Sequence, residues 1–224
     1  MNQAGKPDLP SLLTFVLEIK LFDMKTLITL LIMATTTTAA MAQTEKKFKE
    51  IKFSETSEII NVSADVLWEI IGPGFADAAV WATNVDHAVS SGEPQFEGAT
   101  CSERACDLNA KGFNKIREVI SIYDPKKRIL AFDITEGLPG FVVYSNSHWQ
   151  ITPIGPNQAK ITVTVTIHAK KFMGTLMGGM LKSNIKRAIP VLINDLTIYA
   201  QTGKISKEKR ERMEKIGKKP VATL

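Results

Sequence analysis

The sequence predicts an α+β fold, in which a curved antiparallel sheet is covered by one long C-terminal helix. Residues 161–167 alternate between apolar residues and threonines, which is the pattern of a strand with one buried face. Residues 174–202 are expected to form the helix, because apolar residues recur there every three or four positions (Met177, Leu181, Ile185, Ile189, Leu192, Leu196 and Tyr199). This stripe predicts that the helix lies across the sheet.

Two short helices are expected after the first strand. Residues 56–62 predict that strand, after a polar, lysine-rich lead-in over residues 43–56. Ser63 is a favourable N-cap for a helix over residues 64–71, and a Gly-Pro-Gly sequence then ends it. A second short helix is expected over residues 75–80.

Six further strands complete the predicted sheet. Sequences rich in Gly, Pro, Asn and Asp separate them, as expected for tight turns. The strands are expected near residues 85–90, 99–108, 113–123, 128–136, 142–154 and 159–171. Pro190 lies inside the long helix and is expected to kink it, because proline removes a backbone donor and crowds the preceding turn.

The N-terminal region has the pattern of a secretory signal peptide. Met24 and Lys25 precede a short apolar run over residues 26–33, and Ala40-Met41-Ala42 resembles a cleavage site. Residues 24–42 are therefore interpreted as a signal peptide, and residues 1–23 as an upstream extension. A membrane anchor or a buried helix is the alternative, but the run is short for a bilayer span. We expect export to the periplasm or the extracellular space.

Charge is concentrated at the C-terminus. Of the 224 residues, 44% are apolar, enough for one domain with a core, which we assign to residues 56–203. The basic tail, residues 204–224, carries eight Lys or Arg and three Glu, which accounts for the formal net charge of +5. We interpret it as a solvated, partly helical end; contact with anionic lipid is the alternative. No aromatic residue is interleaved with the charges, which argues against nucleic-acid binding.

Strand parity brings two opposite charges to the inner face of the sheet. Ile116 and Ile120 mark that face on one strand, so Glu118 shares it, and Leu108 marks it on the preceding strand, so Arg104 and Cys106 share it. A hairpin between these strands would place Arg104 opposite Glu118. The pair is either a polar anchor for a ligand or a structural ion pair.

The same reasoning predicts the other cavity-lining residues. Small hydroxyls on an apolar wall leave volume and offer hydrogen bonds, and methionines near glycines make an adaptable wall. Trp81 is either core or ligand contact, and His87 shares the parity of two valines. The remaining candidates are Phe132, Ser145, Ser147 and Trp149 on the strands and Met177, Met180, Leu181, Ile185 and Leu192 on the helix.

No catalytic, metal or cofactor motif accompanies these residues. His148 and His168 are expected on outward faces, and no two histidines have the spacing of zinc ligands. The sequence has no nucleophile elbow, phosphate-binding loop or dinucleotide fingerprint. Cys101 and Cys106, five residues apart on one strand, would be ~16 Å apart, too far for a disulfide, so two free thiols are expected.

The order of elements resembles the START-like (SRPBCC) superfamily, also described as polyketide cyclase/dehydrase-like, over about residues 56–205. The resemblance rests on several matching stretches: residues 60–68; Phe75, Trp81 and Val85; residues 98–106 with Arg104; Glu118; residues 171–174; and residues 199–203. It implies a helix-grip fold, with a seven-stranded antiparallel sheet wrapped around the C-terminal helix and a cavity between them. Members of the superfamily bind or process lipids, sterols, hormones and polyketides.

The sequence therefore predicts an exported protein that binds a hydrophobic small molecule between sheet and helix. The alternative is a cyclase, dehydratase or hydrolase in which Glu118 or His87 moves a proton. A third hypothesis is a membrane-peripheral protein whose basic tail contacts anionic lipid. Neither the ligand nor the oligomeric state follows from the sequence.

Overall fold

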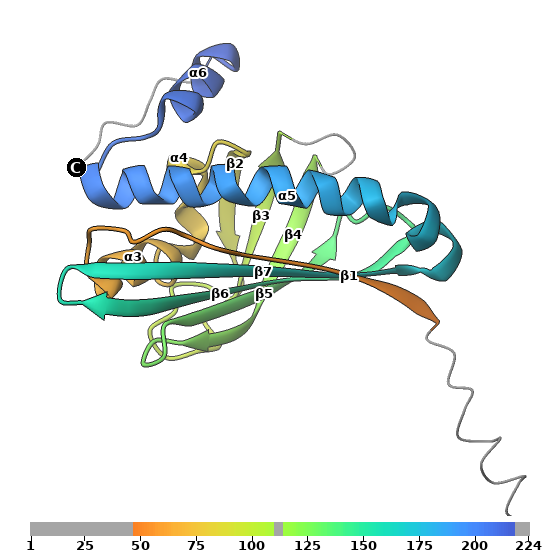
Figure 1. Cartoon of the computed structure of the whole chain (residues 1–224), viewed down its shortest axis with the longest axis horizontal. Helices are drawn as coiled ribbons and strands as arrows, with labels where there is room; N and C mark the ends of the chain where they lie inside the picture. Colours follow the sequence, from red (N-terminus) through yellow and green to blue (C-terminus); the bar gives the residue numbers. More distant parts are fainter. Residues whose placement is uncertain (1–46, 110–113, 218–224) are drawn as a thin grey trace, which may run out of the picture. The chain divides into compact units, whose positions relative to one another are not determined.

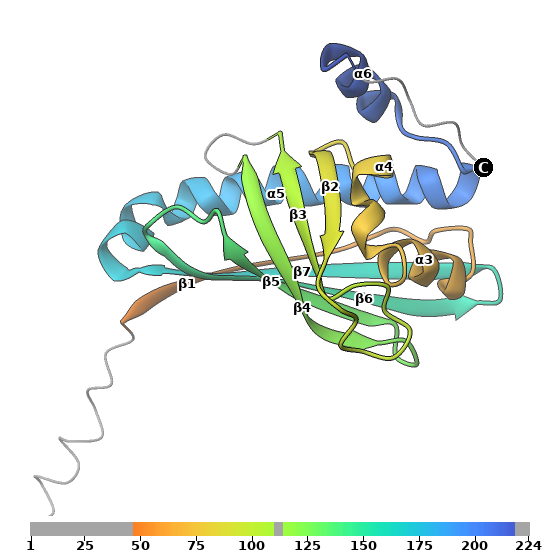
Figure 2. The same ribbon diagram turned by 180° about the vertical axis from the view of Figure 1, so that it is seen from behind.

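The computed structural model describes residues 47–109 and 114–217 of the chain. Its centre is one seven-stranded antiparallel sheet with strand order β1-β7-β6-β5-β4-β3-β2. The strands curve around the long helix α5 (Lys171–Thr202), which crosses one face of the sheet (Figures 1 and 2). The strands are β1 (Phe48–Thr56), β2 (Val85–Ser91), β3 (Glu103–Leu108), β4 (Lys115–Asp124), β5 (Ile129–Glu136), β6 (Val142–Gly155) and β7 (Gln158–Lys170). The predicted helix-grip architecture is confirmed.

The helices between β1 and β2 also follow the prediction. Ser63 caps α3 (Ala64–Ile71), and its side chain accepts a hydrogen bond from the backbone N–H of Val66. A 3₁₀ turn, η1 (Phe75–Asp77), leads into α4 (Ala78–Trp81). These helices pack their apolar sides into the same core as the sheet.

Helix α5 packs on the sheet differently at its two ends. At its start, Gly174 and Gly178 lie directly on β1, and a Cβ at Gly174 would approach the Cβ of Lys49 to 2.9 Å. A larger residue at this position would push the helix away from the strand. At its other end the helix stops at Gly203, whose left-handed φ of 65° suits glycine. The helix continues through Pro190. The kink expected at this residue remains a prediction.

The first strand begins earlier than predicted. Residues 56–62 were expected to form it, but β1 covers Phe48–Thr56, and Ile60 makes only an isolated bridge to Ala159. The lysine-rich segment forms a strand because β1 is an edge strand whose outer face is solvated. Only Ile51 and its alternating neighbours need to face the core, opposite Ile167 and Val165 of β7.

A register shift overturns the parity prediction for His87, and two further shifts change the facing of residues in β4 and β6. A shift between Val85 and His87 turns His87 and Val89 outward and brings Ala88 toward the core instead. A second shift, in β4, exposes Ile122 and buries Tyr123, and a third, at the start of β6, exposes Val143. An extra residue in a strand reverses the facing of every residue after it, so simple alternation fails there.

The basic tail is more ordered than predicted. Residues 207–215 form helix α6 (Lys207–Lys215), capped by Ser206. Lys209 is fully buried and donates to the Val85 carbonyl, while Arg212 pairs with the Asp86 carboxylate on β2. Over residues 206–213 the tail therefore packs against the domain, and the prediction of a solvated end is wrong for this part.

Within the described part of the chain, both cysteines are buried and neither forms a disulfide, as predicted. No helix of residues 47–109 and 114–217 is both long enough and apolar enough to cross a membrane. The predicted signal peptide, residues 24–42, and the extension before it lie outside the described residues.

Asp195 fixes the tail to the core, and its replacement by alanine is expected to destabilise the protein strongly. Its buried carboxylate accepts from the Thr83 backbone N–H at 2.8 Å and from the Ser206 hydroxyl at 2.6 Å. Asp195→Ala leaves both donors buried without their acceptor, so the free energy of unfolding in urea should fall by about 3 kcal/mol.

Asp195→Asn is the matched control, because it keeps one acceptor oxygen in place. Its loss of stability should be clearly smaller. An Asp195→Ala variant as stable as Asp195→Asn would contradict this role of the carboxylate.

Candidate functional site

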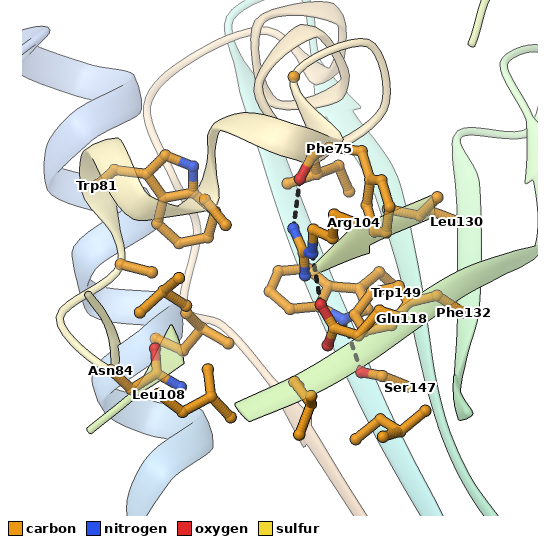
Figure 3. Close-up of a pocket in the computed structure, with 18 of the residues that line it drawn as sticks. Phe75, Trp81, Asn84, Arg104, Leu108, Glu118, Leu130, Phe132, Ser147 and Trp149 are labelled. Carbon is orange, nitrogen blue, oxygen red and sulfur yellow. Dashed lines mark hydrogen bonds and ion pairs between the residues drawn. The ribbon is translucent and has the colours of Figure 1, made fainter. Parts of the chain in front are cut away.

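A cavity of about 170 Å³ lies inside the curve of the sheet. Figure 3 shows its lining residues converging from the short helices, the central strands and α5. Most of them are apolar, and the polar ones are few. The lining consists of Ile70, Ile71, Gly74, Phe75, Ala78, Trp81, Ala82, Asn84, Val85, Arg104, Leu108, Ile116, Glu118, Leu130, Phe132, Ile134, Ser145, Ser147, Trp149, Val165 and Leu192.

A buried ion pair between Arg104 and Glu118 crosses one wall of this cavity. The two residues are direct partners on β3 and β4, as predicted, with Cys106 opposite Ile116 two residues further along β3. The Arg104 Nε lies 2.5 Å from the Glu118 Oε2, and both residues are at least 91% buried. Each charge is therefore neutralised by the other within the protein.

The guanidinium of Arg104 is held by more than its carboxylate partner. Its Nη1 donates to the Phe75 carbonyl, and it stacks over the Phe75 and Phe132 rings at 4.1 and 5.1 Å from their centroids. Burial is the largest influence and would lower the pKa of Arg104, but Glu118 together with Cys106 and Cys101 outweighs it, and the net shift is upward. Arg104 thus stays charged and fixes η1 against the sheet.

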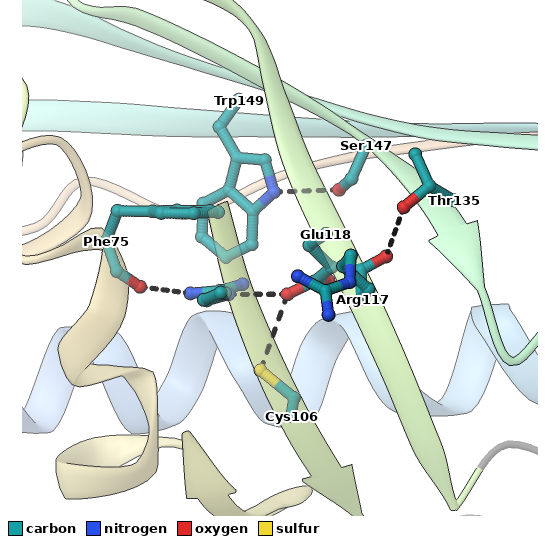
Figure 4. A network of polar contacts seen from close by, with 8 residues as sticks. Phe75, Cys106, Arg117, Glu118, Thr135, Ser147 and Trp149 are labelled. Atoms are coloured by element: carbon teal, nitrogen blue, oxygen red, sulfur yellow. Dashed lines mark hydrogen bonds and ion pairs between the residues drawn. The ribbon is translucent and has the colours of Figure 1, made fainter. Parts of the chain in front are cut away.

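Cys106 contacts the ion pair through its thiol. Its thiol donates to the Glu118 Oε2 at 3.5 Å (Figure 4). Burial, partly offset by Arg104, raises the pKa of Cys106 to about 12. A thiol with this pKa is protonated near neutral pH, whereas nucleophilic cysteines react as thiolates.

Of two tryptophans that line the cavity, one has a hydrogen-bonded indole nitrogen and the other does not. The Trp149 Nε1 donates to the Ser147 hydroxyl at 2.8 Å (Figures 3 and 4). The Trp81 Nε1 and the Asn84 Oδ1 are buried, and neither has a hydrogen-bond partner within the described part of the chain. Both residues line the cavity, on its α4 side (Figure 3). One donor and one acceptor are therefore left without a partner, each in a residue that lines the cavity.

Eight of the predicted ligand-binding residues line the cavity. They come from α4, from four strands and from the C-terminal half of α5. They are Trp81, Arg104, Glu118, Phe132, Ser145, Ser147, Trp149 and Leu192.

The other six predicted residues lie outside the lining. His87 has a 57% exposed side chain, because the shift in β2 turns it outward. Cys106 donates to Glu118 but does not line the cavity. Met177, Met180, Leu181 and Ile185 belong to the first half of α5, where the helix packs directly on β1 and β7. Leu181 there fills a second, separate apolar cluster with Ile51 and Ile167.

Sequence reasoning missed Asn84. It lies in the connection between α4 and β2, where strand parity gives no information. The composition of this segment could have indicated it, because the polar Thr83 and Asn84 interrupt an apolar run from α4 to Val85.

No group of three or more His, Cys, Asp or Glu residues in segments 47–109 and 114–217 is arranged to hold a metal ion. The polar residues among those that line the cavity are Asn84, Arg104, Glu118, Ser145 and Ser147, and Trp81 adds a buried indole N–H.

Solved structures share this fold at low sequence identity. Norcoclaurine synthase from Thalictrum flavum is 16% identical, with a TM-score of 0.56 over 72% of this chain and 91% of that one. A START superfamily protein from Mycobacterium smegmatis is 15% identical, with a TM-score of 0.55 over 67% and 97%. The Zhui aromatase/cyclase from a Streptomyces species is 15% identical, with a TM-score of 0.55 over 68% and 94%.

A comparison with curated proteins finds no match. Residues 50–192 match the sequence profile described as "Polyketide cyclase / dehydrase and lipid transport", which covers more than half of the chain. With the shared fold, this match confirms the resemblance to the START-like superfamily, and the protein belongs to the polyketide cyclase/dehydrase and lipid transport family.

Proposed function

We propose that this protein binds an uncharged, single-ring hydrophobic molecule that carries both a hydrogen-bond acceptor and a hydroxyl. The observation that supports this most directly is that Trp81 and Asn84, two residues that line an apolar cavity, each have a buried polar atom without a partner among the described residues. A buried polar group without a partner is costly, about 1–3 kcal/mol. A guest that supplies both partners recovers that cost on binding.

The size of the cavity limits the guest. At about 170 Å³ it is close to an engineered cavity of roughly 150 Å³ that accepts benzene. One aromatic ring with small substituents fits this volume, whereas a sterol or a fused polyketide does not fit without expansion of the walls.

The ion pair favours an uncharged guest. The charges of Arg104 and Glu118 already neutralise each other at 2.5 Å, deep in the wall. A carboxylate on the guest would have to compete with Glu118 for the guanidinium and give up its own water. Of the two roles open from the sequence, the structural ion pair is the one we propose.

The family is consistent with such a ligand. It supports hydrophobic ligand binding or cyclase-type chemistry in this fold. One structure of the similar norcoclaurine synthase holds dopamine and hydroxybenzaldehyde. Hydroxybenzaldehyde combines one ring, a carbonyl acceptor and a hydroxyl donor, so it is a suitable probe for the Trp81 and Asn84 groups.

Trp81→Phe is expected to weaken hydroxybenzaldehyde binding about fivefold to tenfold, because the ring stays while the donor is lost. Isothermal titration calorimetry measures the dissociation constant. Benzaldehyde, which lacks the hydroxyl, should bind more weakly than the probe to the unchanged protein.

Trp149→Phe is the matched control. It makes the same change in the same cavity, but its Nε1 is already bonded to Ser147. Equal losses for the two variants would contradict the proposed donor, and the absence of any binding by the unchanged protein would refute the single-ring guest.

The alternative function is an acid–base enzyme, and one observation favours it. Both hydrogen bonds that Glu118 accepts from described residues use Oε2, so Oε1 is the oxygen left for a guest. His87, the other proposed proton carrier, is exposed and outside the cavity. Of these two residues, Glu118 is therefore the one we propose for proton transfer to a guest.

Glu118→Gln distinguishes the two functions. For a binding protein we expect the free energy of unfolding to fall by about 3 kcal/mol, because Arg104 loses its counter-charge, while hydroxybenzaldehyde still binds. Loss of a chemical turnover with binding retained would instead support the enzyme. Glu103→Gln, in a half-buried pair with Arg117 on the same strands, should cost less than about 1 kcal/mol.

We further propose that the protein acts after export. The support is the signal-peptide pattern of residues 24–42. Protein isolated from the cell envelope or medium of its source should begin just after Ala42, as measured by N-terminal sequencing. A protein that retains residues 24–42 would contradict export by cleavage.

A further inference from the structure

The start of α5 presents an apolar stripe to solvent. Phe172, Leu176 and Met180 are 79%, 72% and 51% exposed. They are spaced by four residues, so they lie along one side of the helix. We call these three residues the α5 stripe. Large side chains exposed in a continuous row are unusual on a soluble surface and mark sites of interaction.

The stripe cannot turn into the core, because the opposite side of the helix is fixed. Gly174 and Gly178 face β1 so closely that a Cβ on either would lie within 3.4 Å of a β1 side chain, and Leu181 is buried in the adjacent apolar cluster. Phe48, 43% exposed, pairs with Lys170 at the same end of the sheet and adds apolar surface there. The exposure of the stripe is thus built into the packing of α5 on β1.

The segment of the sequence that contains the stripe carries basic residues and no acidic ones, and the acidic residue of β1 at this end of the sheet, Glu50, lies 3.4 Å from the ring of His168. Residues 137–194, which include β6, β7 and most of α5, contain neither Asp nor Glu. They contain five lysines and one arginine, Lys160, Lys170, Lys171, Lys182, Lys186 and Arg187, of which three follow the stripe on α5. An apolar helical side flanked by basic residues is typical of a helix that lies on an anionic lipid surface.

We propose that the α5 stripe docks this protein on an anionic membrane surface. The apolar side chains enter the boundary between headgroups and acyl chains, and the flanking lysines attract the lipid phosphates. A second copy is a poorer occupant. A symmetric contact would bring this predominantly basic region against itself, and like charges would repel.

The stripe, and not the C-terminal tail, carries this contact. The predicted contact of residues 204–224 with lipid has less support, because Lys209 and Arg212 bind groups of β2. The membrane proposal is independent of the ligand proposed for the cavity, since it rests on a different surface.

A Phe172→Trp variant of the full chain tests the proposal at the stripe itself. The three native tryptophans are buried, so the new emission reports on this position and not on membrane contact elsewhere in the chain. With phosphatidylcholine vesicles that contain phosphatidylglycerol, the added emission should shift to the blue and be quenched by brominated lipid. Vesicles of phosphatidylcholine alone should have a much smaller effect.

Ile122→Trp is the matched control, because Ile122 is 45% exposed on β4. Its emission should not change with either vesicle. Lys182→Glu with Lys186→Glu, added to the Phe172→Trp variant, should weaken binding to the anionic vesicles at least about tenfold.

Three results would overturn the proposal. They are an unchanged emission of the Phe172→Trp variant with anionic vesicles, an equal response to both vesicle types, and a concentration-dependent shift without vesicles. The last result would assign the stripe to a second copy of the chain.

Discussion

The ion pair between Arg104 and Glu118 is the interaction on which the site depends. A guanidinium and a carboxylate so deeply buried are tolerated only when each satisfies the other. Because Arg104 also donates to the Phe75 carbonyl and contacts the Phe75 and Phe132 rings, it links η1 to β3, β4 and β5. The position of Trp81, four residues after η1 ends, follows from this link. The pair thus shapes the cavity without having to contact a guest.

The long helix has two different tasks along its length. Its first half packs on β1 and β7 through glycines and a small apolar cluster, and this close packing leaves no space for a ligand. Its second half stands over the larger core, where Leu192 reaches the cavity and Asp195 receives the tail. Separating these tasks explains why a methionine-rich segment that resembles a ligand wall contacts solvent and strand instead.

Local patterns predicted the architecture and the charged hairpin, because these depend on alternation and on turn position. Arg104 and Glu118 pair as expected since the strands between them are regular. The errors have identifiable physical causes. His87 is misplaced by a register shift that alternation cannot reveal. The edge strand β1 was missed because solvent on one side permits a polar composition, and Asn84 because connections have no parity.

The contacts of α6 have a consequence for solubility. β2 is the last strand of the sheet, so its outer backbone groups have no neighbouring strand to pair with. Lys209 donates to the Val85 carbonyl and Arg212 pairs with the adjacent Asp86 carboxylate, so α6 covers one end of this edge. An uncovered edge is a template for pairing with strands of other molecules. Proteolysis between α5 and α6 would therefore promote aggregation of an otherwise folded domain, and the charged C-terminal helix protects against self-association.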